Sequence, residues 1–369
     1  MKNLFKLIVI LFVISFYSCQ RHEGYTITGN VTGFPDSTMI YLTNLATQEN
    51  FDSALVVNNR FQFKGQLQDE PEEIRLNTIV NNKYIYASLL IGNENIKVEG
   101  DIGDFPRDIN ITGSKTQDDY TYARNLTKSF YIKRDSLTRV FFGLSPEEQQ
   151  KRWGDIWSEI GVIDDTVQKI RVEYIKSHLD TYNGAIELGY LKKSFPKDTL
   201  QALYDRLSKE IKNSKYARVI AVYLNEKISE IGDLYHNFEA INSIGDKIVF
   251  SDLIGKYILL EFTSAGCGPC IQAVDELKLI DKTYSDSLRI VSFSADAKKD
   301  VWLRSLERDN VSWTSLWDGK GSYSETYIKY GVSALPTFFL IDPNGKIIDK
   351  WPGYGKGSLE NRLQRFKNK

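Results

Sequence analysis

The stretch LLEFTSAGCGPCIQAVDEL, Leu259 to Leu277, decides the fold expected for the C-terminal part of this 369-residue chain. An apolar run is followed by two cysteines in Cys-x-x-Cys spacing, Cys267 and Cys270, and then by a helical pattern. Pro269 suits the first turn of a helix, where a proline loses no helical hydrogen bond. Unpaired N–H groups at a helix start favour a thiolate over a thiol. The pattern therefore predicts a nucleophilic Cys267 and a resolving Cys270 one turn further on.

Two other uses of a cysteine pair have to be weighed. A structural zinc ion needs four ligands, and the chain offers no second cysteine pair, while His22, His178 and His236 are scattered. A permanent structural disulfide across so small a loop would remove little chain entropy. We therefore expect a redox pair, with no metal and no cofactor.

The rest of the chain divides into segments with different patterns of apolar and polar residues. Residues 24–114 show short alternating apolar runs separated by turn residues, which predicts an antiparallel, β-sandwich-like domain. Residues 115–232 have a helical period. From residue 237 onward strands and helices alternate, which predicts an α/β domain with a mixed sheet over 237–369. The predicted fold class is multidomain α/β.

The helical segment carries two further signals. A capping box with proline at the first helical position begins at Ser145. The following apolar residues recur at steps of three and four and form what we call the heptad seam. This seam predicts either a homodimer surface or a helical hairpin packed on its own chain, and the second is favoured because Gly154 and Gly161 would weaken a free-standing coil. Further helices are expected from Pro196 to Ile211 and from Tyr216 to Ile231. The seam comprises Trp153, Ile156, Ile160, Ile163, Val167, Ile170 and Tyr174.

The first residues, MKNLFKLIVILFVISFYSC, have the pattern of a secretory leader over 1–18, with lysines ahead of an apolar run too short to span a bilayer. Cys19 directly after a small residue resembles the lipobox of bacterial lipoproteins, which implies lipidation of Cys19; simple secretion with a free thiol is the alternative. We expect a lipid-anchored protein of the cell envelope that faces the periplasm. A net charge of −1 argues against nucleic acid as a partner.

From about Asn237 to its end the chain resembles the thioredoxin superfamily, specifically TlpA/ResA-type thiol-disulfide oxidoreductases. CGPC is the thioredoxin active-site tetrapeptide, and VSFSADAKKDVWLRSLERDNVSW and YGVSALPTFFLIDPNGKII look like the second strand with its inserted helix and the later strand pair. The segment 24–114 looks like a domain of unknown function that precedes such modules. The resemblance implies protein thiols or disulfides as substrates and an upstream dithiol as electron donor.

The resemblance also implies roles for single residues. Pro336 corresponds to a cis-proline that faces the disulfide, with Leu335 and Thr337 beside it, and Gly268 and Pro269 shape the cysteine loop. A cis X-Pro bond is uncommon and persists where function requires the turn.

Glu261 lies where thioredoxins place a buried acid. A carboxyl in an apolar strand has a raised pKa, so Glu261 can exchange a proton with Cys270. The alternative is a surface charge at the strand end. Gly266 stands where relatives usually carry a tryptophan, which leaves the entrance to the cysteines wider.

Three functions follow from the sequence. The first is a thiol-disulfide oxidoreductase acting as a reductant, which the resemblance of the Gly-Pro pair favours. The second is a peroxiredoxin-like peroxidase, although Leu260 occupies the position of that motif's proline, with Ser264 at its threonine position. The third is a non-catalytic lipoprotein binding module whose dithiol is only regulatory.

Overall fold

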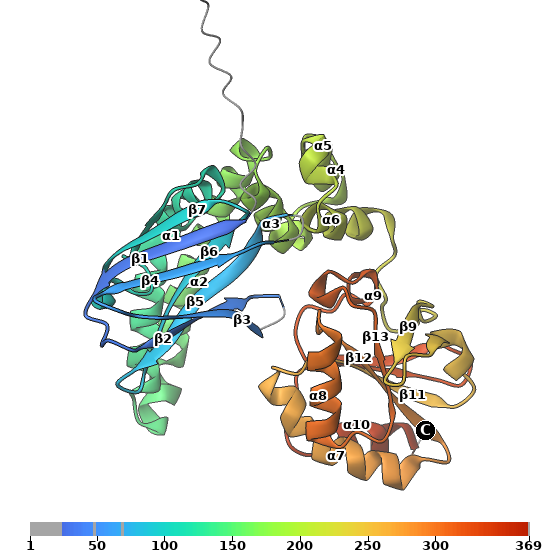
Figure 1. Cartoon of the computed structure of the whole chain (residues 1–369). Coiled ribbons are helices and arrows are strands. Elements are labelled where there is room, and N and C mark those ends of the chain that lie inside the picture. Colours follow the sequence, from blue (N-terminus) through green and yellow to red (C-terminus); the bar gives the residue numbers. More distant parts are fainter. Residues whose placement is uncertain (1–23, 47–48, 68–69, 368–369) are drawn as a thin grey trace, which may run out of the picture.

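The structure is a computed structural model that describes residues 24–46, 49–67 and 70–367. It has a β-rich N-terminal part, a helical middle part and a C-terminal part with one mixed sheet, which confirms the predicted fold class (Figure 1). The expected leader, 1–18, and Cys19 lie outside the described residues.

The N-terminal part consists of two four-stranded sheets that enclose one apolar core. Inward positions of the first strand alternate with outward ones, as the period-two pattern predicted. All pairs are antiparallel except β1 with β7, which run parallel because the chain returns to β1 only after building the second sheet. The sheet orders are β4-β1-β7-β8 and β3-β2-β5-β6. The strands are β1 (Tyr25–Thr32), β2 (Met39–Asn44), β3 (Glu49–Leu55), β4 (Arg60–Gly65), β5 (Glu72–Val80), β6 (Lys83–Ile91), β7 (Asn95–Asp101) and β8 (Asn110–Thr112).

The middle part begins with a long helical hairpin. The predicted capping box is present, with the Ser145 and Glu148 side chains each bonded to the other's backbone N–H. The heptad seam packs against α1 of the same chain through Ile156, Ile160 and Ile163, so the hairpin alternative describes the structure. Trp153, the first residue of the seam, is 57% exposed, but its ring still meets the Phe141 ring of α1 edge to face. The helices are α1 (Lys115–Phe142), α2 (Pro146–Ser177), α3 (Tyr182–Leu191), α4 (Lys197–Asp205), α5 (Lys209–Lys212) and α6 (Lys215–Asn225).

Two helices expected from the sequence were wrong in extent. The one expected from Pro196 to Ile211 is divided into α4 and α5, because Ser208 starts a new helix by accepting the N–H of Ile211. The one expected to reach Ile231 ends at Asn225. The residues after it form an irregular segment that bonds instead to the C-terminal part.

The C-terminal part is one seven-stranded mixed sheet with helices on both faces, in the order β10-β9-β13-β12-β11-β14-β15. Central strand β11 pairs parallel with β12 and antiparallel with β14, and apolar cores cover both of its faces. Burial on both faces explains its nearly continuous apolar run. The strands are β9 (Glu239–Asn242), β10 (Lys247–Val249), β11 (Tyr257–Thr263), β12 (Leu288–Ser294), β13 (Thr314–Trp317), β14 (Thr337–Ile341) and β15 (Ile347–Pro352). The helices are α7 (Gly268–Tyr284), α8 (Lys299–Asp309), α9 (Glu325–Lys329) and α10 (Ser358–Lys367). The described residues also form the 3₁₀ helices η1 (Ile102–Asp104), η2 (Lys192–Ser194), η3 (Phe250–Leu253) and η4 (Gly321–Tyr323).

The segment between α6 and β9 is bound to the C-terminal part of the chain. The N–H groups of Ser229, Gly232 and Tyr235 donate to the carbonyl oxygens of residues 329, 347 and 345. We therefore propose domains at 24–114 and 115–228, with the third domain beginning near residue 229 rather than 237.

The helical part meets the C-terminal domain through α6. This helix packs against α9 and η4. The rings of Tyr216 and Tyr323 meet edge to face with centroids 5.5 Å apart. Lys215 places its ammonium 5.1 Å from the centroid of the Tyr323 ring. These contacts set the position of the helices relative to the C-terminal sheet.

Candidate active site

The two cysteines lie at the start of α7, directly after β11. Cys267 is the N-cap residue and is bonded to Cys270, with their Cα atoms 5.2 Å apart. The Cys270 N–H donates to the sulfur of Cys267 over 3.2 Å. Cys267 is half-buried, whereas Cys270 is 3% exposed. A second molecule can therefore reach the first sulfur and not the second.

The loop before Cys267 is held by a buried acid that the sequence analysis missed. Both carboxylate oxygens of Asp296 accept the Ala265 N–H at 3.1 Å, and Ser294 donates its hydroxyl to Asp296 at 2.7 Å. Arg308 donates to the carbonyl oxygen of Ala265 at 2.9 Å. Asp296 is 2% exposed, and burial raises the pKa of its carboxyl. The segment SFSAD, with polar residues at alternate positions, was the signal that could have revealed it.

The Leu335–Pro336 peptide bond is cis. This turn leads into β14, where Thr337 lies opposite Phe262 near the end of β11, so the turn and the cysteine loop lie at one edge of the sheet. Thr337 donates its hydroxyl to the carbonyl oxygen of Ala334 at 2.6 Å, which fixes the turn. Leu335 is half-buried and Pro336 is buried.

Glu261 is buried in the middle of the domain and is not a surface charge. Its side chain is 3% exposed and accepts the Ser292 hydroxyl at 2.6 Å, and Trp313 donates its indole N–H to Ser292 at 2.7 Å. The pKa of Glu261 is raised to about 7, chiefly by burial; the Ser292 hydrogen bond opposes the rise, and the nearby Asp309 charge adds to it. A carboxyl with this pKa can take up or release a proton at neutral pH.

A small cavity connects Glu261 with the buried cysteine. It has a volume of about 30 Å³, and its lining includes Glu261, Cys270, Ser292 and Asp296. A volume above roughly 15 Å³ with several polar partners can hold a water molecule. The cavity thus offers a short route for a proton between the resolving thiol and the Glu261 carboxyl.

The other predicted site residues lie at the surface of the cysteine loop. Gly268 and Pro269 occupy the first turn of α7 and are exposed, and Gly266 is exposed as well. No aromatic side chain at position 266 screens Cys267. The roles of these residues stay predictions.

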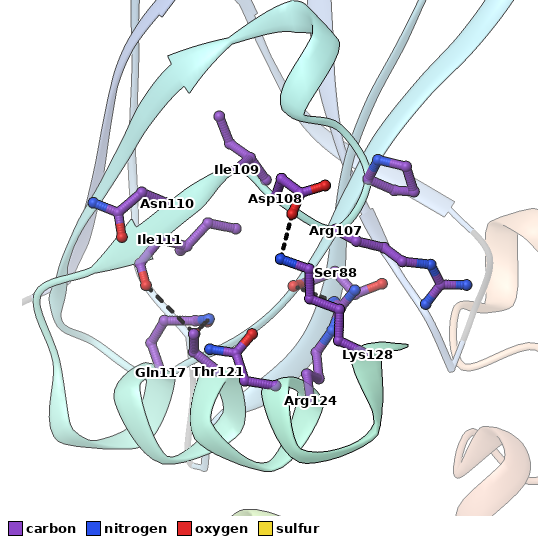
Figure 2. A pocket seen from close by; sticks show the side chains of 12 residues that line it. Ser88, Arg107, Asp108, Ile109, Asn110, Ile111, Gln117, Thr121, Arg124 and Lys128 are labelled. Atoms are coloured by element: carbon purple, nitrogen blue, oxygen red, sulfur yellow. Dashed lines mark hydrogen bonds and ion pairs between the residues drawn. The ribbon is translucent and has the colours of Figure 1, made fainter. Parts of the chain in front are cut away.

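A second hollow lies between α1 and the segment before β8 (Figure 2). It has a volume of about 170 Å³ and is lined by cationic side chains whose charges already have partners. Arg107 pairs with Asp135 and Lys128 with Asp108, while Arg124 donates to the carbonyl oxygen of residue 88. These contacts stabilise the junction of α1 with the β-domain and leave little charge to attract a ligand.

Two general observations concern the part of the chain that the structure describes. Within it, no set of three or more His, Cys, Asp or Glu side chains is arranged to hold a metal ion. None of the helices seen there combines the length and apolar character that a bilayer crossing requires.

Comparison with known proteins finds relatives of two parts of the chain. Residues 255–347 match the family model described as Thioredoxin-like, and residues 25–120 match a domain of unknown function (DUF4369). The thiol-disulfide oxidoreductase ResA of Bacillus thuringiensis is 29% identical over 146 residues, which are 39% of this chain and 83% of that protein. The thioredoxin-like protein YneN of Bacillus subtilis is 30% identical over 123 residues, 32% of this chain and 70% of that protein.

Among solved structures, a thiol-disulfide oxidoreductase from Bacteroides fragilis is 28% identical, with a TM-score of 0.34 over 36% of this chain and 99% of the other. The sequence relatives and the cysteine geometry agree. The chain belongs to the thioredoxin-like family, and its C-terminal domain is that of a thiol-disulfide oxidoreductase.

Proposed function

We propose that this protein reduces disulfide bonds of other proteins outside the cytoplasm, by cycling Cys267 and Cys270 between dithiol and disulfide. The observation that carries the proposal is the asymmetry of the pair. Cys267 is accessible at the N-terminus of α7, and its bonded partner Cys270 is buried above a proton-accepting carboxyl.

The reaction proceeds in two exchanges. The Cys267 thiolate attacks one sulfur of the substrate disulfide; a bond forms between them, and the other substrate sulfur leaves as a thiolate that takes a proton. Cys270 then attacks Cys267 and releases the second substrate thiolate. The substrate gains two electrons, and the protein is left with the Cys267–Cys270 disulfide. An upstream dithiol donor returns it to the reduced form.

Glu261 serves the second exchange. Cys270 must lose a proton before it can attack, and the cavity joins it to a carboxylate that is about half ionised at neutral pH. Burial also keeps bulk water from taking over this step. We therefore assign Glu261 as the general base for Cys270.

The same carboxyl supports the proposed direction of electron flow. A strong oxidant of this family is one whose reduced form is stabilised. A buried, partly ionised Glu261 disfavours a second negative charge on the thiols nearby, which destabilises the reduced form. The Gly-Pro pair between the cysteines points the same way by resemblance. The pair should give up electrons readily.

The location of the protein in the cell is also part of the proposal. The leader pattern over 1–18 supports export, and Cys19 after a small residue supports a lipid anchor in the cell envelope, facing the periplasm. A shift of the mature chain's mass by an acyl group on Cys19 is the measurement that checks this placement.

Trapping tests the reaction. The Cys270→Ala variant, reduced and mixed with oxidised insulin or cell-envelope extract, should accumulate a mixed disulfide through Cys267, and Cys267→Ser should give none. Titration against dithiol couples should give a potential near the thioredoxin value of about −270 mV, whereas a value near about −120 mV would overturn the reductant assignment. If the reduced wild-type protein does not reduce the disulfides of insulin, the proposed activity itself is wrong.

A further inference from the structure

A cleft of about 530 Å³ lies between the helical segment and the C-terminal domain; we call it the interdomain cleft. One wall comes from α3 and α6, including Gly189, Tyr190 and Val219. The opposite wall includes Ser264 and Leu335. Its volume falls within the range of about 300–1,000 Å³ that ligand sites occupy. Half of this cleft is therefore built by residues outside the thioredoxin-like domain.

The cleft borders the reactive cysteine. The carbonyl oxygen of Ser264 accepts the N–H of Cys267 at 3.1 Å. Leu335 on the same wall immediately precedes the cis-proline turn. A polypeptide whose sulfur meets Cys267 beside this turn therefore continues directly into the interdomain cleft.

The lining favours apolar and aromatic side chains. Tyr190 is 61% exposed, and its hydroxyl donates to Glu73 at 2.8 Å, so its ring is held in place while remaining open to contact. Glu73 is largely enclosed, and burial raises the pKa of its carboxyl. Rings fixed in this way can take up an apolar side chain without losing rotational freedom on binding.

The rim carries uncompensated positive charge. Lys193 lies on the cleft itself, and Arg218 and Lys320 line an adjoining hollow of about 240 Å³. In the described part of the chain these three exposed side chains form no ion pair, whereas Lys215 beside them is neutralised by Glu72. The net charge of the whole chain is −1, so this local excess is not a general property of the surface.

We propose that the interdomain cleft binds a segment of the protein substrate next to its disulfide, with an apolar or aromatic side chain in the cleft and acidic side chains at the rim. This inference rests on the proposed function. It gives the helical segment a role in choosing which disulfides reach Cys267.

A cleft-filling variant tests the proposal. Gly189 lines the cleft, and a Cβ added there would lie 3.8 Å from the carbonyl oxygen of Tyr216 and 4.0 Å from Ile220, which are ordinary van der Waals contacts, so Gly189→Leu is the variant chosen to fill it. Leucine also favours the helix more than glycine does. Gly161→Leu is the matched control, because that helical glycine has nothing within 4 Å of its added Cβ and lies away from the cleft.

The probes are short cysteine peptides carried as mixed disulfides with thionitrobenzoate, whose release is followed by absorbance. One set has Phe and Asp on either side of the cysteine, and the other has Gly and Ser. Reduced wild-type protein should react faster with the Phe/Asp set by on the order of tenfold, since burial of one apolar side chain contributes at least that much. Gly189→Leu should lose this preference, and Gly161→Leu should keep it.

A charge reversal tests the rim. Lys193→Glu should lower the rate with the Phe/Asp peptides several-fold and leave the Gly/Ser peptides unaffected, compared with Lys169→Glu on the exposed face of α2. The free aromatic disulfide, in which two thionitrobenzoate groups are joined without any peptide, serves as a probe whose reaction does not depend on the cleft. All these variants should react with it at the wild-type rate.

The outcomes separate the two proposals. Equal wild-type rates with both peptide sets, while the free aromatic disulfide and insulin still react, would overturn the cleft and leave the oxidoreductase function standing. If none of the disulfides reacts, the proposed function fails instead. A change of sedimentation in Gly189→Leu would show that a second copy occupies the cleft and would overturn the proposal. The proposal would also be overturned if a shortened chain starting at Gly24 reacted faster than the longer chain, because the residues before Gly24 would then be the occupant of the cleft.

Discussion

The substitution Glu261→Gln should make the C-terminal domain more stable at alkaline pH while making it less active. In the wild-type protein burial raises the pKa of Glu261 from 4.5 to about 7, whereas in the unfolded chain it titrates near its ordinary value. Between pH 4.5 and 7 the folded state therefore holds more protons than the unfolded state. The free energy of unfolding falls as the pH rises through this window, and the full loss is present above pH 7.

The size of the effect follows from the pKa difference. A shift from 4.5 to about 7 corresponds to about 3 kcal/mol of unfolding free energy. Glutamine keeps an oxygen that can accept the Ser292 hydroxyl but carries no charge. Glu261→Gln should thus match the wild type below pH 4.5 and exceed its stability by up to about 3 kcal/mol at pH 8.

Hydrogen exchange of the β11 amides is the suitable assay, because it reports opening of this domain separately from the others. The oxidised wild type, Glu261→Gln and the exposed control Glu307→Gln are compared at pH 4.5 and pH 8. The same Glu261→Gln protein should resolve mixed disulfides more slowly by on the order of a hundredfold. A stability difference between wild type and Glu261→Gln that is the same at both pH values would refute the reasoning.

Three further changes probe other contacts. Ser292→Ala removes a hydrogen bond that lowers the pKa of Glu261, so the pH at which mixed-disulfide resolution is half-maximal should rise, as measured by stopped-flow kinetics. Ser145→Ala removes the cap of α2 and should cost about 1 kcal/mol, seen as faster hydrogen exchange in its first turn. Gly29→Ala would place a Cβ 2.0 Å from the Phe61 ring and should destabilise the β-domain by about 2 kcal/mol or more in thermal unfolding, while Cys267 keeps its reactivity.

Each of these has an outcome that counts against it. An unchanged pH profile in Ser292→Ala would mean that the Ser292 hydroxyl does not affect the pKa of Glu261. Unchanged exchange in α2 would show that the capping box adds nothing at Ser145. A Gly29→Ala protein with wild-type thermal unfolding would indicate that the Phe61 ring moves aside freely.

Local signals made much of the C-terminal domain predictable. The cysteine spacing, Pro269 and the apolar run of β11 each specify a conformation through a few neighbouring residues. The cis bond before Pro336 came from the resemblance, because no local pattern distinguishes it from a trans bond.

The missed features depend on contacts between distant residues. Asp296 is important because its carboxylate meets Ala265, 31 positions earlier, and sequence position alone does not show that meeting. The parallel pairing of β1 with β7 depends likewise on the path of the chain between them. The helix expected to reach Ile231 ended early because residues 229–235 gain backbone partners in the C-terminal domain, which outweighs their helical tendency.

That attachment has a mechanical consequence. Since α6 ends at Asn225 and Ser229 is already bonded to the end of α9, residues 226–228 form the whole connection between the two lobes. The two lobes therefore cannot drift apart as if they were joined by a long tether. Cys267 must then be approached from a narrow range of directions, so a bulky folded protein has to offer its disulfide on a protruding loop.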